Sequence, residues 1–285
     1  MAKLLLGAPV ADALTETLSR KVKSLSEQQI VPKLAIIRVG ERPDDLSYER
    51  GALKRCEKVG IEVSRFLLDA DCSQEELIAT IEQVNEDPSI HGCLMFRPLP
   101  DSLDEVAACE ALDPEKDVDC ITRGSLYGVL ANRPVGFAPC TAEAVLELLE
   151  HYGYELSGAR ITVIGRSLVI GKPVSMMLLT RNATVTICHT RTKDLVKECR
   201  DADIVVVATG FIGTFGAEHA APGQVIVDVG INWNEELGRL CGDVDFDAVE
   251  PIVDAITPVP RGVGSVTTAV LAKHVVLAAE RQANR

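Results

Sequence analysis

The chain has 285 residues, of which 47% are apolar and only 4% aromatic, and its formal net charge is −13. This length suits two domains, and a core built mainly from Val, Ile, Leu and Ala is typical of parallel strands covered on both faces by helices. The strongly acidic charge repels phosphate backbones, which excludes nucleic acid as an expected partner.

The nine cysteines form no C-x-x-C pair and no Cys/His cluster at zinc spacing. We therefore expect no metal site. An odd number of cysteines without a signal peptide predicts a reducing, cytoplasmic location. No apolar run approaches the roughly 18 residues that a membrane-spanning helix needs, so no membrane contact is expected.

The first half alternates strands and helices. Predicted strands cover 33–40, 61–68 and 91–96, and predicted helices cover 47–60 and 73–87. Gly60 ends the first helix, and Ser73 with Glu76 forms a capping box at the start of the second. This βαβαβ series predicts a parallel α/β domain.

A loop-rich stretch, 112–141, follows and has few periodic apolar residues. It is a candidate domain boundary and a candidate substrate loop. The second half then repeats the alternation, with helices predicted at 142–153, 171–182 and 264–285 and strands at 160–165, 183–189, 203–210 and 224–232. This alternation predicts a second parallel α/β domain.

The segment "VIGRSLVIGKP" joins a predicted strand to a predicted helix. Gly165 suits a tight turn, and Gly171 lets backbone approach a phosphate at the helix N-terminus. The glycine spacing differs from G-x-G-x-x-G, so an ordinary strand–turn–helix is the alternative. The place of the segment in a βαβ unit favours a dinucleotide site.

The end of the next predicted strand selects the cofactor. A NAD site places an acid there to bind the ribose 2′-hydroxyl. This chain has His189-Thr190-Arg191-Thr192, with no acid. Arg191, together with Arg166, could pair a 2′-phosphate, so NADP is favoured over NAD. The alternative is that Arg191 is a solvated loop residue.

Blocks along the whole chain resemble one enzyme family. They include "VGERPDDLSYERGALKRCEKVGI", "DPEKDVD", "GRSLVIGKPVSMMLL", "ATVTICHTRT" and "ITPVPRGVGSVTTAVL". Their order and spacing resemble the methylenetetrahydrofolate dehydrogenase/methenyltetrahydrofolate cyclohydrolase (FolD) family, from about residue 4 to the C-terminus.

The resemblance implies an N-terminal three-layer α/β domain and a Rossmann-like NAD(P)-binding domain with a cleft between them. The folate-binding catalytic domain would comprise 1–139 plus 263–285, and the NAD(P)-binding domain 140–262. It also implies a homodimer that pairs through the nucleotide domain. The implied reaction is NADP-dependent oxidation of 5,10-methylenetetrahydrofolate, followed by hydrolysis of the methenyl product to 10-formyltetrahydrofolate.

The resemblance assigns roles to individual residues. Tyr48 would stack near the pterin and Asp119 would hydrogen-bond it, both as catalytic residues. The other implied substrate-binding residues are Phe96, Pro98, Leu99, Gly262, Gly264 and Thr267. The implied cofactor-binding residues are Gly165, Arg166, Ser167, His189, Thr190, Arg191, Thr209, Gly210 and Ile231.

The chain departs from the family pattern at the site itself. The family reads Tyr-x-x-x-Lys, but the fourth residue after Tyr48 is Ala52. Phe96 stands where the family has the glutamine that hydrogen-bonds this lysine. Lys54 is no substitute, because it is rotated about 200° around the helix from Ala52. Cys120 and Arg261 each replace a family glycine, and Ser265 replaces a proline.

The two family reactions depend differently on the lost lysine. Hydride removal from a CH₂ between two nitrogens gives a cation that those nitrogens stabilise, so catalysis is mainly orientation. Hydrolysis needs a general acid–base, which alanine cannot supply. The leading hypothesis is a dehydrogenase, NAD(P)-dependent, with weak or absent cyclohydrolase activity.

Three alternatives remain. The first is a bifunctional enzyme with a replacement base, for which Arg97 is a poor candidate because guanidinium stays protonated. The second is a non-enzymatic folate- or nucleotide-binding paralogue. The third is an enzyme for a different one-carbon pterin.

Overall fold

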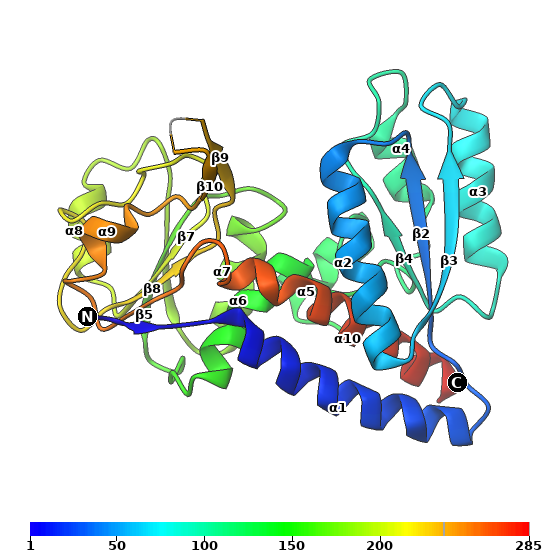
Figure 1. Cartoon of the computed structure of the whole chain (residues 1–285), viewed down its shortest axis with the longest axis horizontal. Coiled ribbons are helices and arrows are strands. Elements are labelled where there is room, and N and C mark those ends of the chain that lie inside the picture. The colour runs from blue at the N-terminus through cyan, green and yellow to red at the C-terminus, as the bar shows by residue number, and fades with distance from the viewer. Residues whose placement is uncertain (236, 285) are drawn as a thin grey trace. The chain divides into compact units, whose positions relative to one another are not determined.

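A computed structural model of the chain describes residues 1–235 and 237–284 (Figure 1). They form two compact units. Unit 1 comprises Met1–Ala11 and Thr141–Thr267, and unit 2 comprises Asp12–Cys140 and Thr268–Arg285. Among the described residues, no helix combines the length and apolar character that crossing a membrane would require.

Unit 2 is built on a parallel sheet of three strands in the order β3-β2-β4. Its elements are β2 (Lys33–Val39), α2 (Pro43–Val59), β3 (Glu62–Leu68), α3 (Gln74–Glu86), β4 (Gly92–Met95), α4 (Glu105–Ala111), α5 (Arg123–Ala131) and most of α10 (Thr267–Ala283). Helix α1 (Gly7–Glu27) begins in unit 1 and runs into unit 2.

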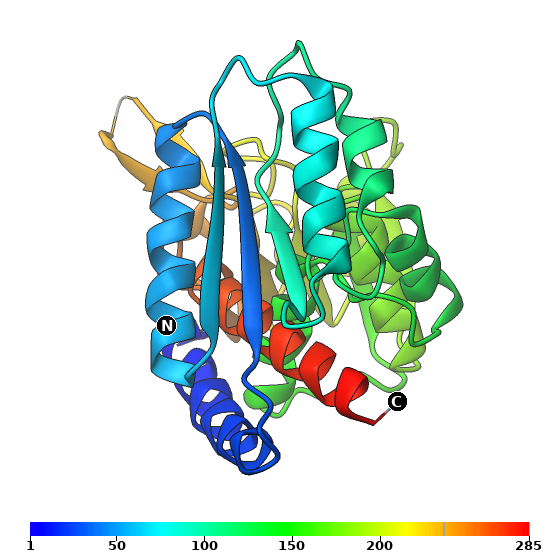
Figure 2. The ribbon, with the colours of Figure 1, turned by 90° about the vertical axis from the view of Figure 1, so that its right-hand side faces the viewer.

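Helices cover both faces of this sheet. Ala35, Ile37 and Met95 pack in one core with Leu77 and Ile81 of α3. Side chains alternate between faces along a strand, so Leu34 and Ile36, both fully buried, point to the other face, on which α2 and α10 lie. Figure 2 shows the three strands side by side, with α2 on one side of them and α3 on the other. The predicted three-layer α/β arrangement is confirmed.

Local sequence explains how α2 begins and ends. Pro43 stands at its first position and Asp44 and Asp45 lie in its first turn, which is why the helix begins before the predicted residue 47. Gly60 ends it as predicted, with φ of 91° and its N–H donating to Cys56 O.

Unit 1 contains a six-stranded parallel sheet in the order β1-β11-β8-β7-β5-β6. Its strands are β1 (Lys3–Leu4), β5 (Arg160–Ile164), β6 (Thr184–Cys188), β7 (Ile204–Val207), β8 (Val225–Asp228) and β11 (Ala255–Ile256). Its other elements are α6 (Cys140–His151), α7 (Gly171–Thr180), α8 (Leu195–Arg200), α9 (Phe246–Val249), the hairpin of β9 (Asn232–Asn234) and β10 (Arg239–Cys241), and a 3₁₀ turn, Val263–Ser265.

Strand β5 lies at a topological switch point. The chain passes from β5 to β6 on one side, and then to β7 on the other side of β5. Connections that leave in opposite directions open a crevice at the carboxyl end of the central strand. The segment that starts at Gly165 is placed at this crevice, as a Rossmann-like sheet requires.

Two features differ from the sequence expectations. The loop-rich stretch 112–141 contains α5, which is short, holds two glycines, and is capped by the Thr122 side chain. Strand β1 pairs with β11, which places residues 1–11 in unit 1. The expected first domain, 1–139, included those residues. The units divide near 140 and 267, so the predicted functional domains with boundaries at 139 and 262 stay a prediction.

Candidate active site

In unit 2, Tyr48 and Phe96 come together near the carboxyl end of the sheet. Tyr48 lies on α2, and Phe96 follows β4 directly. Their ring centroids are 6.0 Å apart with planes at 81°, an edge-to-face contact. Phe96 is 8% exposed, and its N–H donates to Ile37 O at 3.0 Å. The pair therefore forms a mainly apolar wall.

Ala52 lies on the buried face of α2 and is fully buried. Lys54 is exposed, so its ammonium group does not replace a side chain at position 52. Along this part of the helix, Ala52 offers the sheet a methyl group and no acid or base. Cys56 lies one turn further along α2, and burial raises the pKa of its thiol to about 12.

The segment after Phe96 is held by Glu105. The Leu99 N–H donates to Glu105 Oε2 at 2.9 Å, and Arg97 Nη1 lies 3.6 Å from Glu105 Oε1. Arg42 donates from Nη1 to Pro98 O at 2.9 Å. These contacts fix the backbone of the predicted substrate residues Pro98 and Leu99, and they pair Arg97 with a carboxylate.

Asp119 is bound to the start of α6. The Cys140 N–H donates to Asp119 Oδ1 at 3.1 Å. Burial raises the pKa of the Asp119 carboxyl, while the Cys140 hydrogen bonds and the Arg97 guanidinium act in the opposite direction. A carboxyl group at this position is suited to hydrogen-bond a ring with polar nitrogens.

A neighbouring acid shapes the loop that carries Asp119. Asp117 is fully buried, and its carboxylate accepts from the N–H groups of Asp119 at 3.3 Å, Ile121 at 3.0 Å and Thr122 at 2.8 Å. The role of Asp117 was not predicted from the sequence, in which the repeated acid of "DVD" is the available signal.

In unit 1, two glycines build the turn after β5. Gly165 has φ of 131°, and a Cβ there would overlap the carbonyl oxygen of Ala208. A Cβ on Gly171 would overlap the carbonyl of Gly165 itself. The turn therefore tolerates only glycine at both positions, and it leaves backbone accessible at the start of α7.

The predicted phosphate loop is completed by Ser167. Its Oγ accepts from the Ile170 N–H at 3.1 Å. Arg166 beside it is exposed, and its guanidinium has no protein partner in the described part of the chain.

The turn after β6 contains the predicted cofactor residues His189, Thr190 and Arg191. His189 Nδ1 accepts from the Arg191 N–H at 3.1 Å, and the His189 N–H donates to Thr192 Oγ1 at 2.9 Å. No carboxylate belongs to this turn. The Arg191 guanidinium is exposed and, within residues 1–235 and 237–284, has no protein partner. Both cations are thus available to an anionic group.

A chain of buried carboxylates orders the loop at Thr209 and Gly210. Asp243 Oδ2 accepts from Thr209 N at 2.6 Å and from Gly210 N at 2.9 Å. The Asp243 N–H in turn donates to Asp228 Oδ1 at 3.0 Å. Burial raises the pKa of Asp228 to about 6. Both carboxylates accept hydrogen bonds from backbone N–H groups and thereby order this loop.

Ile231, Gly262, Gly264 and Thr267 lie together in unit 1. The first three line a pocket of about 210 Å³. Thr267 Oγ1 donates to Gly264 O at 3.2 Å. The predicted substrate residues are thus split, since Tyr48 and Asp119 belong to unit 2.

Cys120 and Arg261, which the resemblance places at glycine positions, have the backbone that glycine favours. Cys120 has φ of 61° and Arg261 has φ of 86°. Both values lie in the left-handed region, which costs a residue with a side chain roughly 1–2 kcal/mol. The backbone at these positions is therefore the one that the family glycines imply.

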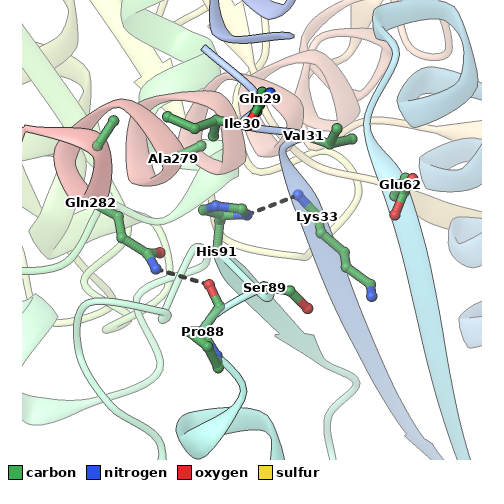
Figure 3. Close-up of a pocket in the computed structure, with 11 residues that line it drawn as sticks. Gln29, Ile30, Val31, Lys33, Glu62, Pro88, Ser89, His91, Ala279 and Gln282 are labelled. Carbon is green, nitrogen blue, oxygen red and sulfur yellow. Dashed lines mark hydrogen bonds between the residues drawn. The ribbon is translucent and has the colours of Figure 1, made fainter.

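A separate pocket of about 470 Å³ lies at the opposite, amino-terminal edge of the unit 2 sheet (Figure 3). Lys33 begins β2, Glu62 begins β3, and His91 precedes β4. His91 Nδ1 accepts from the Lys33 N–H at 3.1 Å. Figure 3 shows Glu62 and Lys33 on the same side of this pocket. This amino-terminal pocket shares no residue with the candidate site. The described residues also contain no group of three or more His, Cys, Asp or Glu side chains suited to a metal ion.

Comparisons with known proteins match both halves of the chain to one family. The model for the catalytic domain of tetrahydrofolate dehydrogenase/cyclohydrolase matches residues 5–119. The model for the NAD(P)-binding domain of the same family matches residues 139–283. A "Bifunctional protein FolD" from Carboxydothermus hydrogenoformans is 53% identical over 281 residues, covering 98% of each chain.

Solved structures lead to the same family. The bifunctional FolD enzyme of Campylobacter jejuni superposes with a TM-score of 0.94 at 37% identity and 99% coverage of each chain. The Trypanosoma brucei enzyme, solved with NADP and an inhibitor, gives a TM-score of 0.92 at 34% identity, covering 100% of this chain and 99% of that one. The chain therefore belongs to the tetrahydrofolate dehydrogenase/cyclohydrolase family.

Proposed function

We propose that this protein oxidises 5,10-methylenetetrahydrofolate to the 5,10-methenyl form with NADP, and that it has weak or absent cyclohydrolase activity. The observation that carries the proposal is the contrast between the two halves of the site. The dinucleotide loop has glycine at both positions where a Cβ would overlap backbone, while position 52, on the buried face of α2, carries only a methyl group.

The residues of unit 2 suit binding and orientation of a pterin. Tyr48 offers an aromatic ring whose position is fixed by Phe96. Asp119 offers a partly buried carboxyl group to the ring nitrogens. Holding the CH₂ donor in place against its acceptor is sufficient for hydride loss, because the two flanking nitrogens stabilise the cation that forms.

The residues of unit 1 fit NADP. The bare backbone at Gly165 and Gly171 can receive the pyrophosphate at the start of α7, and Ser167 borders it. The unpaired guanidinium groups of Arg166 and Arg191 suit a 2′-phosphate. The bound nicotinamide would supply the hydride acceptor. Thr209, Gly210 and Ile231 would border its ribose and amide, and NAD remains the second choice.

Hydrolysis of the methenyl cation needs a group that activates water and moves protons. Neither Ala52 nor Phe96 has a titratable atom. The relatives named bifunctional are about half identical to this chain, so this step is where its activity would differ from the one in their name.

The decisive experiment supplies methylenetetrahydrofolate and NADP and follows the formation and the decay of the methenyl product separately. We expect the methenyl form to accumulate, decaying at its uncatalysed rate. Rapid catalysed decay would refute the loss of cyclohydrolase activity. Absence of NADPH formation with either cofactor would refute the dehydrogenase.

A bifunctional enzyme with a replacement group is the second candidate. The Arg97 guanidinium acts on the Asp119 carboxyl and is itself paired with Glu105, so a polar pair borders the site. An Arg97→Ala variant that loses hydrolysis but keeps NADP reduction would support this candidate. An unchanged ratio of the two rates would eliminate it.

A folate-binding paralogue and an enzyme for a different pterin are tested by calorimetry. Tetrahydrofolate binding without turnover would indicate a paralogue with a decayed site. Absence of binding would indicate another ligand.

We also propose a homodimer that pairs through unit 1. The β9–β10 hairpin carries Trp233, Leu237 and Leu240 with exposures of 63%, 57% and 39%. Apolar side chains of this size on a hairpin favour a protein partner. Sedimentation equilibrium would test the dimer, and a monomer at micromolar concentration would refute it. The cytoplasmic location stays a prediction.

A further inference from the structure

A buried ion pair joins α2 to the sheet of unit 2. Arg38 Nε lies 2.9 Å from Glu49 Oε2, and both side chains are only 5% exposed. Arg38 belongs to β2, and Glu49 belongs to α2, directly after Tyr48. The pair therefore connects the strand to the helix next to the aromatic residue of the candidate site.

Further contacts extend the pair into a network. Arg38 Nη1 donates to Gly40 O in the turn between β2 and α2, and Arg65 Nη1 approaches Glu49 Oε1 at 3.5 Å. Asp45, one turn earlier on α2, is also buried, and the Arg38 charge opposes the rise that burial causes in its pKa. Arg38 thus ties the strand end, the turn and the helix together.

Packing alone does not require these charges. The residues of β2 from Leu34 to Ile37 and Val39 are all aliphatic and at most 5% exposed. Replacing a buried ion pair by apolar residues of similar volume is often neutral or stabilising. Such pairs are best attested as devices that select one arrangement of packed elements.

The buried residues that follow Glu49 on this face of α2 are mainly apolar. Ala52, Cys56 and Val59 are buried and offer the sheet mainly apolar atoms, which allow small shifts along the helix axis. A charged hydrogen bond of 2.9 Å restricts both distance and angle. The ion pair is thus a directional contact that helps to hold the Tyr48 ring edge-to-face with Phe96.

We propose that Arg38 and Glu49 are positioning residues for the reaction, and that they hold Tyr48 in the geometry that binds the pterin. The inference rests on the proposed function, in which Tyr48 contacts the folate substrate. It places the control of folate affinity in a pair of side chains that themselves need not touch the ligand.

The test compares Glu49→Gln with the double variant Arg38→Met/Glu49→Met. The single variant leaves Arg38 buried without its full partner and is expected to be less stable. The double variant removes both charges at similar volume, so its melting temperature should remain near that of the wild type. We expect kcat/KM for methylenetetrahydrofolate to fall roughly tenfold or more in the double variant, while KM for NADP stays within about twofold.

The matched control is Lys21→Met/Glu280→Met. That pair has the same 2.9 Å separation but joins α1 to α10 with side chains 39% and 30% exposed. It should leave both KM values unchanged.

Each outcome decides between the two proposals. A stable double variant with wild-type kcat/KM for the folate would overturn the positioning role and leave the proposed function intact. A wild-type protein that neither reduces NADP nor binds tetrahydrofolate in calorimetry would overturn the proposed function and this inference together. If the wild type binds tetrahydrofolate without turnover, an unchanged dissociation constant in the double variant overturns the positioning role, and a roughly tenfold weaker one supports it.

Discussion

The variant Ala52→Lys/Phe96→Gln introduces an amine on the buried face of α2 and an amide acceptor directly after β4. Ala52 is fully buried and Phe96 is 8% exposed, so both substitutions alter the packed interior rather than a solvated surface. The new lysine starts on the buried face of α2 near Tyr48, in contrast to the exposed Lys54.

The stability cost follows from this burial. Ala52→Lys alone buries an ammonium group one turn from Glu49, whose carboxylate is already paired with Arg38, and this should lower the free energy of unfolding by about 3 kcal/mol. Phe96→Gln alone loses the edge contact with Tyr48, worth about 0.5–1.5 kcal/mol, in addition to apolar burial. In the double variant the amide oxygen accepts from the ammonium, which should return about 1.5 kcal/mol. Urea unfolding of all four forms in a double-mutant cycle measures this coupling.

The activity gain follows from general acid–base catalysis. A positioned proton-transfer group accelerates a reaction typically about 10²–10⁴-fold, so methenyl hydrolysis should rise by at least about 100-fold. The assay adds methenyltetrahydrofolate directly and follows the loss of its absorbance without cofactor. Ala52→Met/Phe96→Gln has a side chain of similar length without the amine and should show no gain. A folded double variant whose hydrolysis matches this control would refute the assignment of position 52 as the missing base.

Four further results are expected. Arg166→Ala/Arg191→Ala should raise KM for NADP by at least about 100-fold with little change for NAD, because it removes two charged hydrogen bonds worth about 1.5–3 kcal/mol each. Equal changes for both cofactors would contradict the 2′-phosphate assignment. Gly165→Ala should lower the free energy of unfolding by more than about 2 kcal/mol, since its Cβ overlaps a strand carbonyl and its φ is positive, and thermal unfolding followed by circular dichroism measures this. For Asp228, burial raises the folded pKa to about 6, so the folded state holds a proton that the unfolded state has lost, and the free energy of unfolding should fall by up to about 3 kcal/mol as pH rises from about 4 to about 6. Asp228→Asn should remove this part of the slope in urea titrations at several pH values. Arg261→Gly should raise the free energy of unfolding by up to about 1 kcal/mol in the same urea assay, because φ of 86° strains a residue with a Cβ, and a loss would show that the guanidinium group makes a stabilising contact.

Elements defined by neighbouring residues were predictable from the sequence. The strand of aliphatic residues before α2, the end of that helix at Gly60, and the Ser73 cap all depend on interactions within a few positions. The turn at Gly165 belongs to the same class, because its glycine follows a strand and precedes a helix. The alanine four residues after Tyr48 was equally visible, because residue identity and spacing are read directly from the sequence.

Features that join distant positions were decided only by the tertiary structure. Strand β1 has two residues and becomes a strand by pairing with β11, about 250 positions away. Arg38 and Glu49 looked like ordinary charged residues, and only their shared burial makes them partners. Asp228 and Asp243 likewise accept from N–H groups 15 and 34 positions away in the chain. Asp117 accepts from an N–H group five positions along its own loop.

The physical reason is the range of the forces involved. Periodicity, capping and glycine turns act through local sterics and hydrogen bonds, which the order of residues largely determines. Burial of a charge, and the hydrogen bonds that then become obligatory, depend on which surfaces the folded chain removes from water. The sequence by itself therefore determined the family pattern, the alternation of elements and the alanine at position 52, and the tertiary structure decided which polar side chains became fixed partners around the site.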